Sequence, residues 1–269
     1  MSGGVEWTLG PRGPLRGTLQ VPGDKSVSHR SLLFHALANG PAVVHGLLES
    51  EDVAATHAAV RALGVHTERQ SDGSLRIEPP ANGLSASAGT VDCGNSGTSI
   101  RLLCGLLAGQ GVAATLTGDD SLSRRPMLRV VDPLRAMGAQ IDGRDNGRFP
   151  PLQLASATLH SARHDLAIAS AQVKSCLLLA GLRCGVAVRE PRVSRDHTER
   201  MLRAMGADLV DAPEGWLELA PTAELAPLDL TVPADVSAAA FWMVAASIVP
   251  GSDVLLPAVG DNPTRTGVV

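Results

Sequence analysis

The chain has 269 residues, of which 44% are apolar and 19% are charged, and its net charge is −4. This composition supports a large core, excludes a disordered chain, and offers no basic excess for binding nucleic acid. No run of about 18 apolar residues predicts a transmembrane helix, and the first residues do not resemble a signal peptide. The four cysteines form no CxxC pair, which indicates free thiols in the cytoplasm, without a disulfide framework or a metal site.

In chain order, one pattern of elements occurs three times. A short apolar strand leads into an Ala/Ser/Leu-rich helix, a second strand, a second helix that ends at Gly, and a hairpin. The first strands are predicted at residues 17–24, 90–95 and 165–170. The first helices open near Lys25, Ser96 and Ala171, and the second ones end in VRALG, PLRAMGA and MLRAMGA. The sequence therefore predicts three β-α-β-α-β-β units.

A fourth unit starts with a strand at 227–235 and a helix at 236–249. The chain ends inside its expected second helix, so we expect an incomplete piece of a longer protein. The first helix of each unit is apolar all round, which is typical of a buried helix, whereas the second helices carry charge on one face. This pattern predicts an α/β fold with buried helices in the middle and sheets around them. A layered α/β sandwich is the alternative.

Small polar turns open the buried helices, in the sequences GDKSVSHR, GNSGTSIR and ASAQVK. A helix N-terminus carries unpaired N–H groups and partial positive charge, and it suits phosphate or carboxylate. Lys25 and Arg30 follow the first turn, while Arg125 and Arg195 precede the second helices of units two and three. Repeat symmetry places these side chains at one end of their units, and Arg125 is expected to open its helix. The ligand implied is small and carries more than one acid group.

The strings VPGDKSVSHR, DCGNSGTSIRLLCGLLAG, SRRPMLRVVDPLRAMGA, SAQVKSCLLLAGL and SRDHTERMLRAMGA resemble the EPSP synthase family, the 3-phosphoshikimate 1-carboxyvinyltransferases. The resemblance spans nearly all of residues 15–269. It implies the enolpyruvyl-transferase fold, an α/β prism with two lobes of three units each. Residues 22–225 would form one complete lobe, and residues 1–21 and 226–269 would belong to the second, incomplete lobe. The sister family of UDP-N-acetylglucosamine enolpyruvyl transferases normally has Lys-Asn where this chain has Lys25-Ser26.

The resemblance also implies a reaction, in which the enolpyruvyl group of phosphoenolpyruvate passes to the 5-hydroxyl of shikimate 3-phosphate and phosphate leaves. It implies no metal or organic cofactor, a monomer when the chain is complete, and glyphosate as an inhibitor. Lys25 would be catalytic and would contact both substrates. The other substrate-binding positions implied are Ser26, Arg30, Ser170, Ala171, Gln172 and Arg195 for shikimate 3-phosphate, with Gln172 shared, and Gly97 and Arg125 for phosphoenolpyruvate.

Two departures from the family pattern limit this expectation. Ala171 stands where many members have Ser, so it can offer only its backbone. The catalytic Asp, a Lys-Glu pair and later arginines of the family would lie beyond Val269, so the chain alone is expected to be inactive. A second hypothesis is a non-catalytic lobe that binds shikimate 3-phosphate weakly, and a third is a UDP-N-acetylglucosamine enolpyruvyl transferase.

Overall fold

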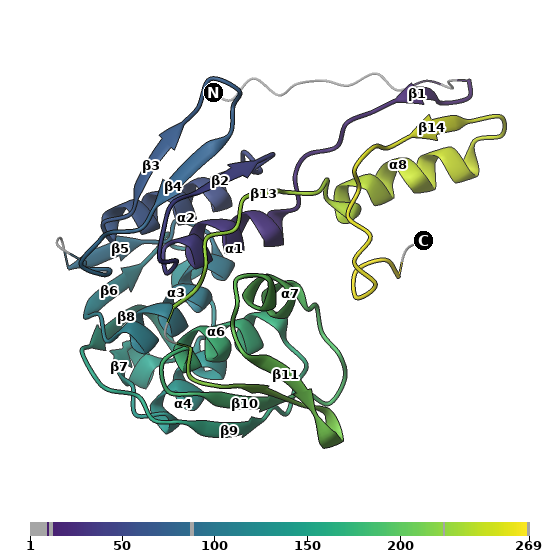
Figure 1. The fold of residues 1–269 in the computed structure, drawn as a ribbon. Coiled ribbons are helices and arrows are strands. Elements are labelled where there is room, and N and C mark those ends of the chain that lie inside the picture. Colours follow the sequence, from purple (N-terminus) through teal and green to yellow (C-terminus); the bar gives the residue numbers. More distant parts are fainter. Residues whose placement is uncertain (1–9, 11–12, 87–88, 223, 268–269) are drawn as a thin grey trace.

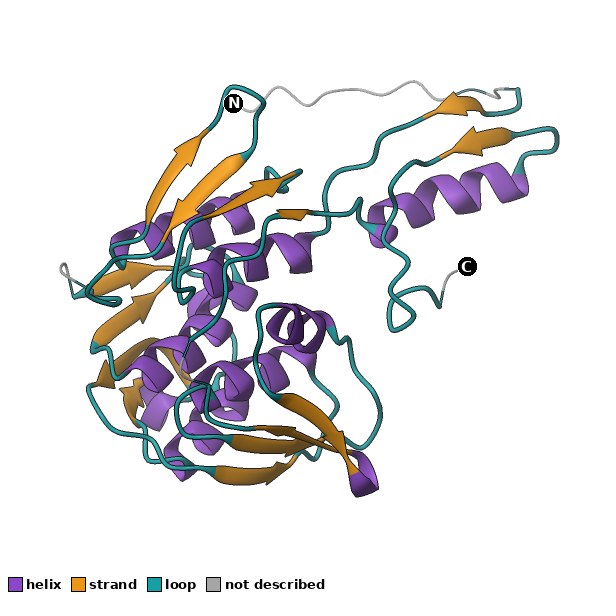
Figure 2. Cartoon of the chain, viewed as in Figure 1, coloured by secondary structure: helices purple, strands orange, loops and turns teal. Residues whose placement is uncertain are grey.

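The computed structural model describes residues 10, 13–86, 89–222 and 224–267. Three four-stranded sheets surround a group of buried helices, and a smaller group of elements lies to one side (Figure 1). Figure 2 shows the strands of the three sheets around a central group of helices, with one long helix apart from them. In the part of the chain that is described, no helix is both long and apolar enough to cross a membrane.

The three large sheets share one strand order. In each sheet the first two strands are parallel, and the two strands of the hairpin continue the sheet in antiparallel fashion. The second unit forms β5 (Thr90–Asp92), β6 (Ala114–Thr117), β8 (Phe149–Ala155) and β7 (Gln140–Gly143). The third unit forms β9 (Ala162–Asp165), β10 (Val186–Arg189), β12 (Trp216–Leu219) and β11 (Leu209–Ala212). The repeat predicted from the sequence is therefore present in the fold.

The sheet of the first unit contains a strand that belongs to the fourth unit in sequence order. Its sheet has the order β13 (Leu230–Thr231), β2 (Ala42–His45), β4 (Leu75–Glu78) and β3 (His66–Arg69). The strand expected to begin this unit, β1 (Arg16–Thr18), instead runs parallel to β14 (Asp253–Leu255) in a separate two-stranded sheet. Because β13 pairs with β2, a strand that lies after residue 225 completes the first sheet. The first strand of the third unit was also expected at 165–170, but it ends at Asp165.

The three first helices form the centre of the lobe, as their all-round apolar character predicts. They are α1 (Lys25–His35), α3 (Gly97–Gln110) and α6 (Ala171–Gly181), and nearly every residue after their first turns is buried. Two glycines of α3 let α6 approach closely. A Cβ at Gly105 would lie 2.0 Å from the carbonyl oxygen of Cys176, and one at Gly109 would lie 2.7 Å from that of Ala180. The expected central group of helices is confirmed, and the layered sandwich is wrong.

The second helices lie between this centre and the solvent. They are α2 (Glu51–Ala62), α4 (Leu128–Ala136) and α7 (His197–Ala204), and each buries one face only. Short turns complete the units: η1 (Leu122–Arg124), α5 (Arg144–Gly147) and η2 (Pro213–Gly215). Arg125 does not open α4, because it lies in an extended connection between η1 and that helix.

The smaller group contains α8 (Val236–Ile248) packed against β14, which pairs with β1 (Figure 1). The chain passes to this group twice, once before Asp24 and once after β13, and the two passages are joined by backbone hydrogen bonds. The N–H of Asp24 donates to the carbonyl of Pro233 at 2.7 Å, and the N–H of Asp235 donates to that of Pro22 at 2.8 Å. The paired passages therefore place the start of α1 beside the start of α8.

Candidate active site

The three buried helices begin at the capping residues that the sequence indicates. The carboxylate of Asp24 accepts a hydrogen bond from the N–H of Val27 at 2.8 Å. The hydroxyls of Ser96 and Ser170 cap α3 and α6 in the same way, at 3.1 and 3.5 Å from the N–H three residues later. A cap satisfies only some of the N–H groups that open a helix, so each of these ends keeps the polarity that favours an anion.

Hydrogen bonds between side chains show that the three helix ends lie together. Arg30 of α1 donates from Nη2 to the hydroxyl of Ser175 of α6 at 2.8 Å. Gln172 of α6 donates from Nε2 to the hydroxyl of Thr98 of α3 at 2.9 Å. The predicted site residues of α1, α3 and α6 are therefore brought to one end of the lobe.

Arg30 is buried, and most of its donors are used within the protein. Its Nε donates to the hydroxyl of Thr198 at 2.7 Å, and its Nη1 donates to the carbonyl of Ser26 at 3.0 Å. With the bond to Ser175, three of its five N–H groups have partners, which leaves one on each Nη for a ligand. Burial lowers the pKa of Arg30 to about 10, so the guanidinium remains charged at neutral pH.

Lys25 lies at the exposed edge of the same group. Its ammonium forms an ion pair with the carboxylate of Asp52 at the start of α2. Its backbone N–H donates to the carboxylate of Asp235 at 3.3 Å. Lys25 therefore contacts both the first unit, through Asp52, and the start of α8, through Asp235. An ammonium that is half exposed and held by one carboxylate can exchange that partner for an anionic ligand at small cost.

Gly97 lies under two guanidinium groups. A Cβ at this position would be 2.8 Å from Nη1 of Arg101 and 3.0 Å from Nη1 of Arg125. Arg101 donates to the carbonyl of Gly97 at 3.1 Å and to the amide oxygen of Gln172 at 3.0 Å. Arg125 bonds the amide oxygen of Asn95 in the turn before α3. Gly97, Arg125 and Gln172 are thus neighbours around Arg101.

A cavity of about 570 Å³ brings together four predicted residues: Ser170, Ala171, Gln172 and Arg195. Ser194 and Thr264 also line it. Arg195 is exposed on the loop before α7, where burial of part of its chain and the neighbouring Arg265 lower the pKa of its guanidinium. The cavity therefore combines a helix N-terminus, an amide and an exposed cation, which suits a small anionic ligand.

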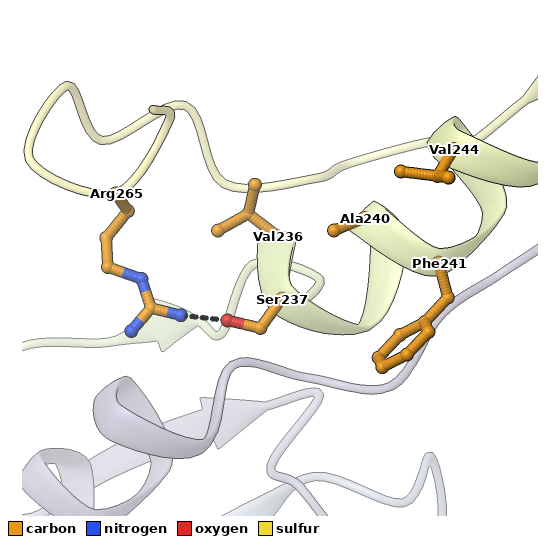
Figure 3. Close-up of a pocket in the computed structure, with 6 residues that line it drawn as sticks. All are labelled: Val236, Ser237, Ala240, Phe241, Val244 and Arg265. Atoms are coloured by element: carbon orange, nitrogen blue, oxygen red, sulfur yellow. Dashed lines mark hydrogen bonds between the residues drawn. The ribbon is translucent and has the colours of Figure 1, made fainter. Parts of the chain in front are cut away.

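Arg265 connects the smaller group to this site. Its Nη2 donates to the hydroxyl of Ser237 at 2.5 Å and lies 3.3 Å from the carboxylate of Asp235 and 3.9 Å from that of Asp24. Figure 3 shows Arg265 reaching Ser237 at one end of a second hollow, of about 630 Å³. The rest of that hollow is apolar and runs along α8, so it does not resemble the anionic site.

The structure adds residues that the sequence reasoning did not select. Arg101 could have been selected from the sequence, because a charged residue one helical turn after Gly97 in an apolar helix is unusual. Asp52 and Glu190 lie on other elements of the same units as the residues they contact, and Arg265 comes from the fourth unit. Their approach depends on tertiary packing. Within the described ranges, no group of three His, Cys, Asp or Glu side chains could hold a metal ion.

Comparison with known proteins agrees with this architecture. The family model for EPSP synthase (3-phosphoshikimate 1-carboxyvinyltransferase) matches residues 9–269. A 3-phosphoshikimate 1-carboxyvinyltransferase of Citrifermentans bemidjiense is 49% identical over 265 residues, which cover 98% of this chain and 62% of the relative. One of Methylococcus capsulatus is 51% identical over 269 residues, with 98% and 61% covered.

A solved EPSP synthase from Acinetobacter baumannii has the same fold, with a TM-score of 0.88 and 48% sequence identity. The match covers 96% of this chain and 59% of that structure. The chain therefore spans about three fifths of the length of the relatives it matches. With a family model matched along almost its whole length and a shared fold, the chain belongs to the EPSP synthase family.

Proposed function

We propose that this chain provides the larger part of an enzyme that transfers the enolpyruvyl group of phosphoenolpyruvate to the 5-hydroxyl of shikimate 3-phosphate. The observation that supports it best is the cavity at the start of α6, where Ser170, Gln172 and Arg195 meet. Both substrates carry phosphate and carboxylate groups, and the site gathers the donors that such groups need. The family resemblance and the relatives' names give the specific reaction.

In the proposed reaction, the 5-hydroxyl oxygen forms a bond to C2 of phosphoenolpyruvate while C3 gains a proton, giving a tetrahedral ketal. C3 then loses a proton, the bond from C2 to the phosphate oxygen breaks, and phosphate leaves with the proton of the original hydroxyl. Neither step requires an oxidant or a metal. Lys25 would stabilise charge at the phosphate between the two substrates, and Arg125 above Gly97 would hold phosphoenolpyruvate.

Shikimate 3-phosphate would occupy the cavity beside α6. Its phosphate would accept hydrogen bonds from Ser170, the backbone of Ala171 and Arg195, and Gln172 would reach both substrates. Ser26 and Arg30 would complete this site from α1, Arg30 with the N–H groups that its protein contacts leave over. Glyphosate, which carries phosphonate and carboxylate groups, would bind where phosphoenolpyruvate does.

We also propose a two-lobe organisation, with the substrates between the lobes. Residues 22–225 would form the complete lobe, whose first sheet is extended by β13 pairing with β2, and residues 1–21 and 226–269 would belong to the second lobe. Residues 1–9, 11–12 and 268–269 of that second lobe lie outside the described residues. A monomer in the cytoplasm is proposed for the complete protein, in keeping with the free cysteines Cys93, Cys104, Cys176 and Cys184.

Two measurements test the proposal. Isothermal titration calorimetry of residues 1–269 is expected to detect binding of shikimate 3-phosphate. A protein of the relatives' full length is expected to release phosphate from phosphoenolpyruvate when shikimate 3-phosphate is present. Residues 1–269 alone are expected to bind but not to convert the substrates. Phosphate release with a UDP-sugar in place of shikimate 3-phosphate would instead assign the chain to the sister activity, and binding without turnover at full length would leave a binding lobe.

A further inference from the structure

A cluster of buried charges lies beneath the proposed phosphate site, and none of its members has a role in the reaction described above. Lys174 of α6 contacts Glu190 at 2.7 Å and Glu199 at 2.6 Å. The side chains of the three residues are only 7%, 7% and 6% exposed. Lys174 is one of two lysines in a chain with 23 basic residues. A compact ammonium fits between two carboxylates where the larger planar guanidinium would need more room.

Glu190 uses both of its carboxylate oxygens to hold turns of the site. Oε1 accepts a hydrogen bond from the N–H of Ser170, the residue that caps α6, at 2.8 Å. Oε2 accepts one from the hydroxyl of Ser194 at 2.7 Å, directly before Arg195. Glu190 immediately follows β10. Its hydrogen bonds therefore connect the end of a sheet strand to the two turns that line the cavity.

The charges of the cluster are balanced, which matters beside an anion site. Burial alone lowers the pKa of Lys174, but attraction by Glu199 and the hydrogen bonds that the ammonium donates to both carboxylates outweigh it and raise that pKa. Glu199 also attracts the buried Arg30. Two cations therefore offset two carboxylates, and Glu190 can remain an acceptor for both turns without repelling a phosphate above them.

We propose that Glu190, neutralised by Lys174, is a positioning residue that fixes the Ser170 and Ser194–Arg195 turns for the phosphate of the bound substrate. This inference rests on the proposed function of the cavity. Glu199 shares the lysine and the side-chain burial of Glu190, but in the part of the chain that is described its carboxylate pairs with Lys174 and accepts no hydrogen bond from either turn. The two glutamates therefore form a matched pair, in which a loss of buried charge can be separated from a loss of positioning.

The decisive variant is Glu190→Gln. An amide offers one oxygen and one NH₂ group, whereas both oxygens of Glu190 face donors, with Ser170 N–H on one and the Lys174 ammonium on the other. Whichever way the amide is turned, its NH₂ group meets either the Ser170 N–H or the Lys174 ammonium, so the charge-assisted arrangement that holds the two turns is disturbed. Glu199→Gln makes the same chemical change without touching a turn, and Glu218→Gln, in the exposed pair with Arg163, is the surface control.

The experiment measures the affinity of residues 1–269 and each variant for shikimate 3-phosphate and for shikimate by calorimetry, with thermal melting to confirm folding. Glu190→Gln is expected to weaken the binding of shikimate 3-phosphate by roughly tenfold or more and to leave the binding of shikimate nearly unchanged. The ratio of the two affinities is therefore expected to fall. Glu199→Gln is expected to lower the melting temperature with a much smaller change in that ratio. Glu218→Gln is expected to change neither quantity.

The possible failures are distinguishable. If the unsubstituted chain does not bind shikimate 3-phosphate, the proposed function is wrong at this site. If it binds and Glu190→Gln keeps the ratio, or if both buried variants reduce it equally, the positioning role is wrong. Should Glu190→Gln fail to fold, Ser194→Ala replaces it, since it removes only the hydroxyl that reaches Glu190. A smaller loss in the same direction supports the inference, and an unchanged ratio overturns it.

Discussion

Gly97 lies beside the guanidinium groups of Arg101 and Arg125, where the proposed site for phosphoenolpyruvate and glyphosate has little room for a methyl group. In Gly97→Ala, the new Cβ would push against the guanidinium ends of Arg101 and Arg125 at 2.8 and 3.0 Å. Both side chains are long, so they shift instead of unfolding the helix, and the space above α3 becomes smaller. We expect the added methyl group to crowd the proposed site, so that glyphosate inhibits the full-length enzyme less strongly. The inhibition constant against phosphoenolpyruvate checks this, and an unchanged constant would contradict it.

A second residue-scale prediction concerns acid stability. His29 is fully buried on α1, where Nδ1 contacts the hydroxyl of Thr56 at 2.7 Å. Burial, with the nearby Lys25 and Arg30, lowers the pKa of His29 from 6.5 to about 3. In the unfolded chain the imidazole gains its proton below pH 6.5, whereas the folded protein keeps it neutral until about pH 3. Stability from this group is therefore complete at neutral pH and is lost as the pH falls.

At pH 5 this difference amounts to about 2 kcal/mol of the free energy of unfolding. We expect His29→Gln to reduce the loss of stability between pH 7 and pH 5 by that amount. Urea unfolding at both pH values measures it, with His66→Gln on the exposed strand β3 as the control. If the pH dependence is the same in all three proteins, the buried neutral imidazole is not its source.

At the scale of elements, close packing of α3 on α6 sets the centre of the lobe. The Cβ of Gly105→Ala would lie 2.0 Å from the carbonyl oxygen of Cys176, which is backbone and cannot turn aside. We expect this variant to lose about 1–3 kcal/mol of stability, despite the higher helix propensity of Ala. Gly40→Ala, whose Cβ would be an ordinary 3.6 Å from Pro227, is the control. Equal melting temperatures of the two variants would mean that the helices can move apart.

The elements also show what the sequence could predict. Helix starts at Asp24, Ser96 and Ser170 were recognisable because capping side chains precede runs of apolar residues. Strand partners were not recognisable, because the first strands of units one and four are both short and apolar and either can pair with β2. In the site, the residue types of the helix N-termini were predictable. The burial of Arg30 depends on packing between the first and third units. The contact of Glu190 with two turns depends on how the elements of its own unit fold together.

At the scale of the whole molecule, the two groups of elements differ in how much they bury. The complete lobe encloses its three apolar helices within three sheets. The fourth such helix, α8, is just as apolar, but the described elements that pack against it leave most of it exposed. Phe241 and Ile248 are 79% and 72% exposed, and the apolar hollow of Figure 3 runs along the same helix. Surfaces of this kind associate with other protein surfaces.

We therefore expect residues 1–269 to self-associate through α8 as concentration rises. Replacing Phe241 and Ile248 together by Asp places charge on that face, so the double variant is expected to remain monomeric under the same conditions. Sedimentation velocity over a range of concentrations measures the effect. Val210→Asp changes an exposed apolar residue of the complete lobe, on β11, and is expected to associate like the unsubstituted chain. If Val210→Asp keeps the chain monomeric while the double variant still associates, the contact lies on the three-sheet lobe and not on α8.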